Sequence, residues 1–219
     1  MNNQDGQISV DCPPSTSESS FETQPSRLLQ SLFENIQAEK PLVVLNIGAA
    51  LPETINFFAN YRCKLFITDL LAEFPLSAYS PRDESESRIT LRDEIADILS
   101  IPDGVVFDIV FFWDSPNYLG EDNISALMQV LKPHLHGKSK AHCFVARSPE
   151  TPEGQIIHGI QDAGHLTVRR RSRFPPNYQP LPQSRLLSLL KSFTLDRSVL
   201  MRDQRLELLL TVVKSDRRV

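Results

Sequence analysis

The chain has 219 residues, 41% of them hydrophobic, which is enough for one domain with a substantial core. A formal net charge of −4 argues against a dedicated nucleic-acid-binding protein or a basic membrane-surface protein, while leaving nucleic acid open as a partner. Three widely spaced cysteines without a CxxC pair argue against a disulfide framework and favour a reducing, cytoplasmic location. No apolar run reaches the roughly 20 residues of a membrane-spanning helix, so we expect no membrane association.

The first part of the chain changes character near residue 25. Residues 1–24 are rich in Ser, Thr, Pro, Gln and Asn, which predicts a disordered N-terminal tail, and we expect 25–219 to form a single domain. Leucines and aromatic residues at helical spacing then predict an amphipathic helix over 26–37. The run "LVVLNIG" that follows is typical of a strand buried on both faces.

Strands and helices alternate from this point. Pro52 suits the first position of a helix whose inward face would carry Leu51, Ile55 and Phe58. The remaining patterns predict strands at 63–70, 107–113 and 142–146, helices at 90–101 and 121–132, and a weak strand near 86–91.

The end of the chain departs from this alternation. Residues 147–182 read as an insertion or cap that could form a hairpin over the mouth of the sheet. A helix at 183–191 precedes two strand-like runs, 193–201 and 205–214, separated by a tight turn. The whole pattern predicts an α/β fold: a Rossmann-like, mostly parallel sheet flanked by helices and closing with a C-terminal antiparallel β-hairpin.

As an ordered set, these segments resemble the class I S-adenosylmethionine-dependent methyltransferases over roughly residues 26–214. "VVLNIG" resembles the first-strand motif of that family, and "LFITDL" resembles its second strand with a terminal acid. "FDIVFFWDSPNYLG" with "ISALMQVLKPHLHGK" looks like the fourth strand, its loop and the following helix. The C-terminal hairpin is similar to the family's reversed final strand. The resemblance implies S-adenosyl-L-methionine as cofactor and methyl transfer to a small-molecule or macromolecular nucleophile.

The residues themselves also indicate a nucleoside site. Ligands of open α/β sheets bind outside the carboxyl ends of the strands, where Gly48 would let the backbone approach a ligand. Asp69 follows 21 residues later, close to the ~20 expected of an acid that binds a ribose diol, although it could instead cap a helix. Glu53, in the first helical turn, would repel a phosphate and so favours the methyl donor over NAD.

The family motif is only partly present. Asn46 stands where the family has an acid, and Ala50 and Pro52 replace its second and third glycines. The resemblance implies cofactor contacts from Asn46, Gly48, Ala50, Asp69 and Trp113. The missing glycines favour an alternative, a catalytically inactive methyltransferase-like protein that acts as a binding or interaction module.

The loop after the fourth predicted strand supplies the candidates for catalysis and substrate binding. Asp114 is the candidate catalytic residue, and Asn117 and Tyr118 are candidate substrate contacts, because "SPNY" weakly resembles a motif of amine methyltransferases. The same loop could simply pack Tyr118 under the next helix.

A group of histidines with a cysteine, and a run of arginines, have simpler explanations than a functional site. His134, His136, His142 and Cys143 occupy a turn and alternate strand positions, so we expect no metal site. The arginine run 169–173, with Arg171 as a candidate substrate contact, would suit an anionic substrate or an acidic partner, or it could be a charged edge strand.

Overall fold

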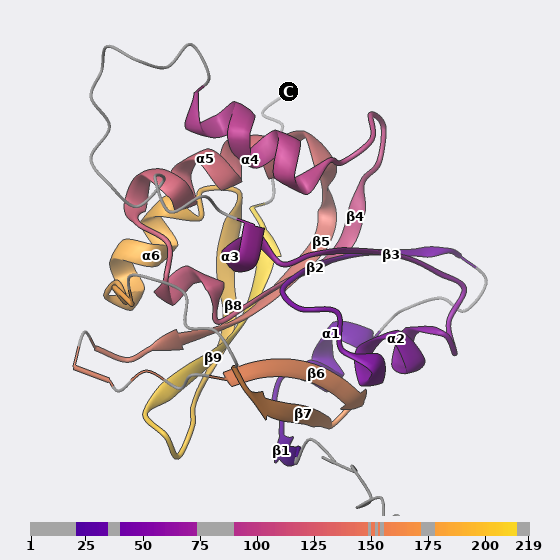
Figure 1. Cartoon of the computed structure of the whole chain (residues 1–219), viewed down its shortest axis with the longest axis vertical. Helices are drawn as coiled ribbons and strands as arrows, with labels where there is room; N and C mark the ends of the chain where they lie inside the picture. The colour runs from indigo at the N-terminus through magenta and orange to yellow at the C-terminus, as the bar shows by residue number, and fades with distance from the viewer. Residues whose placement is uncertain are drawn as a thin grey trace, which may run out of the picture.

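A computed structural model describes residues 21–34, 40–73, 90–148, 150–151, 153, 156–171 and 178–213. Its main sheet has the strand order β3-β2-β4-β5-β9-β8 (Figure 1). The strands are β2 (Leu42–Ile47), β3 (Cys63–Thr68), β4 (Phe107–Trp113), β5 (Leu135–Ala146), β8 (Phe193–Leu200) and β9 (Arg205–Val212). β2 pairs in parallel with β3 and β4, and β4 pairs in parallel with β5, whereas β9 is antiparallel to both β5 and β8. The predicted fold class is confirmed.

The central strands form where the sequence is continuously apolar. Val44 and Leu45 in β2, and Val110 and Phe111 in β4, are fully buried although they point to opposite faces. Such strands need a layer on each side, and both layers are present.

Helices cover the two faces of the sheet unequally (Figure 1). The helices are α1 (Leu29–Phe33), α2 (Pro52–Phe58), α3 (Leu70–Glu73), α4 (Leu91–Leu99), α5 (Glu121–Leu131) and α6 (Gln183–Leu189). Leucines and isoleucines of α3, α4, α5 and α6 share one core with one face of the sheet, and α1 and α2 pack against the other face. The helix predicted at 26–37 begins at Leu29, and residues 35–39 lie outside the described part of the chain.

A second, three-stranded sheet packs on the face of the main sheet that α1 and α2 cover. It has the order β1-β7-β6, from β1 (Glu22–Pro25), β6 (Ile156–Asp162) and β7 (His165–Arg170). Ile160 and Leu166 from this sheet join the core formed by α1, α2 and one face of the main sheet. The insertion therefore does form the predicted hairpin, and it packs on the α1–α2 face of the main sheet.

Three local expectations were wrong. Residues 22–24, assigned to the tail, belong to β1 because their backbone groups pair with β7, a pairing that needs no apolar pattern. Ile55 is 46% exposed, and Thr54 takes the inward position because its Oγ1 accepts a hydrogen bond from the Ile160 N–H. β5 begins at Leu135, seven residues before the predicted strand.

Two other expectations fall largely outside the structure. Residues 1–20 are not among the described residues, and of the weak strand near 86–91 only Thr90 and Leu91 are described. Thr90 caps α4 through a hydrogen bond from the Asp93 N–H, and Leu91 is the first helical residue. In the described segments, no helix is long and apolar enough to cross a membrane.

Candidate functional site

The carboxyl ends of β2 and β3 bring the two best nucleoside candidates together. The Gly48 N–H donates to the Thr68 carbonyl at 2.8 Å, so Gly48 continues the parallel pairing and lies beside Asp69. Asp69 is half-buried, and its carboxylate accepts a weak 3.4 Å bond from the Ala72 N–H at the start of α3. Both predicted roles of Asp69, helix cap and ribose contact, fit this position. Ala50 is exposed on the same edge.

Asn46 and Trp113 are brought together, and each uses its polar atoms on a protein partner. The Trp113 Nε1–H donates to Asn46 Oδ1 at 2.8 Å, and Asn46 Nδ2 donates to the Gly48 carbonyl at 3.0 Å. Both side chains are almost completely buried, at 1% and 3% exposure. A Cβ built on Gly48 would lie 2.9 Å from Trp113 Cδ1. The space beside Gly48 is thus occupied by an indole ring.

The position of this indole depends on an unusual backbone. Trp113 has φ of +50°, in the left-handed region that bulky side chains rarely adopt. Its ring stacks on Phe111 at 4.9 Å and on His158 of β6 at 5.6 Å between centroids. Burial, followed by the Arg205 charge, holds the pKa of His158 well below its usual range, so this imidazole is neutral.

Asp114, the candidate catalytic residue, is paired with Arg171, a candidate substrate contact. Arg171 Nη2 lies 3.1 Å from Asp114 Oδ1, and both side chains are about 90% buried. Burial raises the pKa of Asp114, and the charges of Arg171 and Arg205 oppose that shift. Arg171 also donates to the Ile156 carbonyl at 3.1 Å, so this pair joins the end of β4 to the second sheet.

Asn117 and Tyr118 hold the loop after β4 in place. Asn117 lies in a 3₁₀ turn (Ser115–Asn117), donates to the Phe144 carbonyl at 2.9 Å and accepts from the Ala146 N–H at 2.9 Å. Tyr118 is 1% exposed in the core beneath α5, and burial raises the pKa of its phenol. This arrangement matches the packing alternative for the loop.

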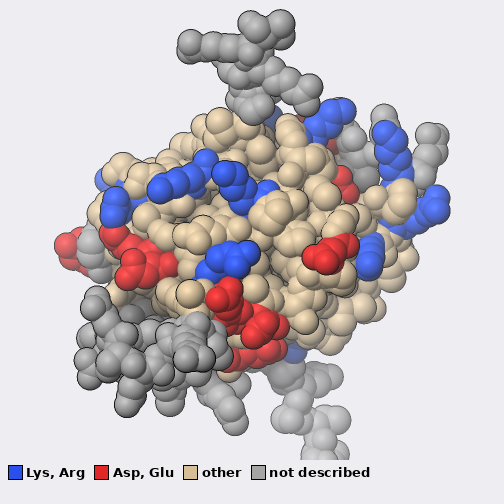
Figure 2. Space-filling view, turned by 90° about the horizontal axis from the view of Figure 1, so that it is seen from above, with Lys and Arg blue, Asp and Glu red and all other residues tan. Residues whose placement is uncertain are grey.

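The arginine run is largely engaged within the protein. Arg169 forms an ion pair with Glu53, which neutralises the acid expected to repel phosphate, so the charge argument for a methyl donor over NAD loses its basis. Arg171 pairs with Asp114, Arg170 is exposed, and residues 172–173 lie outside the described part. Figure 2 shows both basic and acidic side chains of the described residues on one face of the molecule.

Sequence reasoning missed a buried polar cluster on β5 and β9. The Glu207 carboxylate, fully buried, accepts from Ser26 Oγ, from the Arg27 N–H at 3.0 Å and from His142 Nε2 at 2.9 Å. These bonds attach the segment before α1 to the last strand. A glutamate within "LELLL" and a histidine within "HCFVA" were the available signals, since ionisable residues in buried strands are normally paired.

The histidines considered for a metal are separately engaged. His134 Nδ1 bonds to the Val105 carbonyl at 2.7 Å, and His136 Nε2 bonds to Asp108 at 3.0 Å. His142 faces the core beside Trp113, whereas Cys143 faces the core beneath α5. Within the described segments, no group of three or more His, Cys, Asp or Glu side chains could hold a metal ion.

The residues fit one end of S-adenosylmethionine better than the other. Asp69 retains acceptor capacity for a ribose diol, and Ala50 is exposed on the same edge of the sheet. Asn46 is 1% exposed and its amide already bonds to Trp113 and to Gly48, so it is not accessible to the amino-acid end. The nucleoside end therefore fits and the amino-acid end, as Asn46 and Trp113 now lie, does not.

No protein-family model matches the sequence, and no curated protein is significantly similar to it. Among solved structures, a Burkholderia thailandensis 1,6-didemethyltoxoflavin-N1-methyltransferase with bound S-adenosylhomocysteine is similar at a TM-score of 0.46 and 16% identity, over 85% of this chain and 77% of that one. A Clostridium acetobutylicum S-adenosylmethionine-dependent methyltransferase is similar at 0.46 and 12%, over 84% and 89%. A TehB-like methyltransferase of Corynebacterium glutamicum scores 0.44 at 10% identity, over 84% and 87%. Likeness this distant supports no statement about activity, so the fold assignment rests on the order and direction of the strands.

Proposed function

We propose that the chain binds S-adenosylmethionine at the carboxyl ends of β2 and β3 and is a methyltransferase. The observation that carries this proposal is the juxtaposition of Gly48 and Asp69 through the 2.8 Å bond from the Gly48 N–H to the Thr68 carbonyl. It occurs in a sheet whose single reversed strand, β9, lies next to the edge, as the family resemblance implies.

In this proposal the chain mainly binds and orients. Asp69 accepts hydrogen bonds from the ribose hydroxyls, and the small residues Gly48 and Ala50 allow close approach of the backbone. The donor supplies an electrophilic methyl group, and proximity and alignment make up most of the catalytic effect. The acceptor is a nucleophile that carries an acidic group, because Arg170 ends β7 exposed, next to the Arg171 that pairs with Asp114.

A second candidate is a non-catalytic protein of the same fold, and a specific observation favours it. The Trp113 indole fills the space at Gly48, and Asn46 Oδ1 accepts a hydrogen bond from that indole. Asp114, the candidate catalytic residue, is buried in its pair with Arg171. In this case the domain acts as a binding or interaction module.

Calorimetric titration with S-adenosylmethionine and S-adenosylhomocysteine tests binding. We expect Asp69→Asn to weaken binding by roughly tenfold to a hundredfold, the scale of a hydrogen bond to a charged group, while Asn preserves the cap of α3. Asp97→Asn, on the exposed side of α4, is the charge-matched control and should leave affinity unchanged. Absence of binding at millimolar ligand refutes the proposal.

Transfer of a labelled methyl group to components of a cell extract separates the two candidates. Label transferred by the wild-type chain and reduced by Asp69→Asn supports the methyltransferase. Cofactor binding without transfer to any component supports the non-catalytic module.

A further inference from the structure

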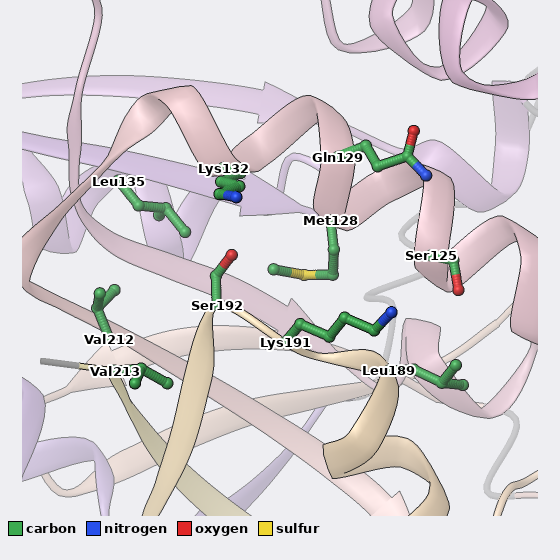
Figure 3. A pocket seen from close by; sticks show the side chains of 10 residues that line it. All are labelled: Ser125, Met128, Gln129, Lys132, Leu135, Leu189, Lys191, Ser192, Val212 and Val213. Carbon is green, nitrogen blue, oxygen red and sulfur yellow. The ribbon is translucent and has the colours of Figure 1, made fainter. Parts of the chain in front are cut away.

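A pocket of about 440 Å³ lies at the end of the main sheet opposite Gly48 and Asp69 (Figure 3). α5 ends there, β5 and β8 begin there, and the antiparallel β9 finishes there. Its location is therefore the amino-terminal edge of the parallel strands, whereas the candidate cofactor site is at the carboxyl edge. The volume is in the range of small-molecule sites.

The floor of this pocket is apolar. Met128 extends from α5 into the pocket with its methyl end toward Ser192, and Leu135 and Val212 form one end of the pocket (Figure 3). Val213 at the rim is 47% exposed, which is high for a large apolar side chain at the end of a buried strand. A thioether and branched aliphatic groups accept an apolar body of variable shape.

The rim of the pocket is basic. Lys132 comes from the end of α5 and Lys191 from the segment between α6 and β8, so the two lysines stand on facing walls (Figure 3). The lining contains no Asp or Glu. Among the residues that the structure describes, neither ammonium group has a hydrogen-bond or ion-pair partner.

We propose that this pocket binds an amphipathic carboxylate, with the apolar body on Met128 and the carboxylate between Lys132 and Lys191. The charge and the apolar floor together select this class. A fully apolar ligand would leave two ammonium groups beside it without an anion, and a small inorganic anion would leave the apolar floor uncovered. The site is independent of the proposed methyl-donor site.

Methionine-methyl NMR of the full chain tests the proposal directly. The chain has three methionines, and Met201, at the turn between β8 and β9, serves as an internal reference. With octanoate as the probe, we expect saturable shifts of the Met128 methyl resonance at up to millimolar ligand and none at Met201. Octanol, which has the same chain without the charge, should bind at least several-fold more weakly, and salt should weaken octanoate binding.

Substitutions at the rim test whether its positive charge contributes to octanoate binding. Val213→Glu places an anion at the rim and should weaken octanoate binding several-fold, whereas Val213→Lys, a similar change in bulk at the same exposed position, should not. Lys191→Gln should weaken it roughly threefold to fivefold, on the scale of a partly exposed ion pair. Lys138→Gln, which removes an equal charge in a different cavity, is the control.

Three results would overturn the proposal: no shift of the Met128 methyl at millimolar octanoate, equal affinity for octanol, or indifference of affinity to both Val213→Glu and Lys191→Gln. Circular dichroism of each variant establishes that it is folded before titration. Loss of S-adenosylmethionine binding bears only on the other site, because Asp69 and Lys191 lie at opposite edges of the sheet.

Discussion

Substituting Gly48 by Ala tests whether the Trp113 indole fills the space beside Gly48 at the candidate cofactor site. The new Cβ would lie 2.9 Å from Trp113 Cδ1 and 3.6 Å from Trp113 Nε1, and the first distance is shorter than carbon atoms tolerate. The indole cannot simply swing aside, because Asn46 holds its Nε1 and Phe111 and His158 stack on its ring. The substitution must therefore displace a packed group.

The expected magnitude combines two opposing effects. Overpacking of a buried site costs about 1–3 kcal/mol. Replacing Gly by Ala also restricts the unfolded chain, which returns about 0.4–1 kcal/mol where the backbone is ordinary, as it is at Gly48. We expect a net loss of about 1–2 kcal/mol in the free energy of unfolding.

A double-mutant cycle assigns this loss to the indole. In a Trp113→Leu background the Cβ has room, so Gly48→Ala should become neutral or stabilise by up to about 0.5–1 kcal/mol. Urea unfolding followed by circular dichroism measures all four proteins. Trp113 is the chain's one tryptophan, so its fluorescence also reports directly on this site in the two proteins that retain it.

Gly137→Ala in β5 is the matched control, because a Cβ there meets nothing within 4 Å among the described residues. It should be neutral or slightly stabilising. An equal cost of Gly48→Ala with and without Trp113, or no cost in the wild-type background, would refute the assignment of the space beside Gly48 to the indole.

Three further predictions concern buried groups. Burial tends to raise the pKa of Glu207, but bonds from His142, Ser26 and the Arg27 N–H hold it below its usual 4.5. Its contribution to stability is therefore present above pH 4.5 and lost as the pH falls below that value. Glu207→Gln should reduce the loss of unfolding free energy between neutral and acid pH, measured by urea unfolding at each pH. The same loss in the variant and the wild type would contradict this. Thr54→Val should cost about 1–3 kcal/mol in urea unfolding, because the buried Ile160 N–H loses its acceptor, and a neutral result would show that the bond is unimportant. Burial raises the pKa of Cys143 to about 12, and burial with the Asp108 charge raises that of the partly buried Cys63 to about 11. In a Cys12→Ser background, Cys143 should not react with Ellman's reagent at about pH 8 until the protein unfolds, and Cys63 should react more slowly than in the unfolded chain.

The main sheet could be predicted from the sequence because its signals are local. β2 and β4 are unbroken apolar runs, and the pair β8 and β9 is separated by a four-residue turn, so both strand type and direction follow from short segments. β1 could not be predicted in this way. Glu22–Pro25 is polar and contains a proline, and it becomes a strand only because β7 offers a free edge.

The places of Gly48 and Asp69 in the fold could be predicted from the sequence, but the contacts of Asn46 and Trp113 could not. The spacing of Gly48 and Asp69 correctly placed both at neighbouring strand ends. The pairing of Asn46 with Trp113 depends on the positive φ of Trp113 and on a hairpin more than 40 residues later in the chain that supplies His158. Such contacts are non-local, and residue spacing carries no information about them.

The place of β9 in the sheet has a consequence for biosynthesis. Arg205–Val212 inserts between β5 and β8, and Leu208, Leu209 and Leu210 at its centre are fully buried. Glu207 on the same strand also holds the segment before α1, more than 170 residues earlier. A nascent chain on the ribosome therefore keeps β5 and β8 as two unpaired edges, and keeps Ser26 and Arg27 without their acceptor, until this strand has emerged. We expect the chain to depend on chaperone protection until synthesis is nearly complete, and truncation before residue 205 to leave an aggregating product rather than a smaller folded domain.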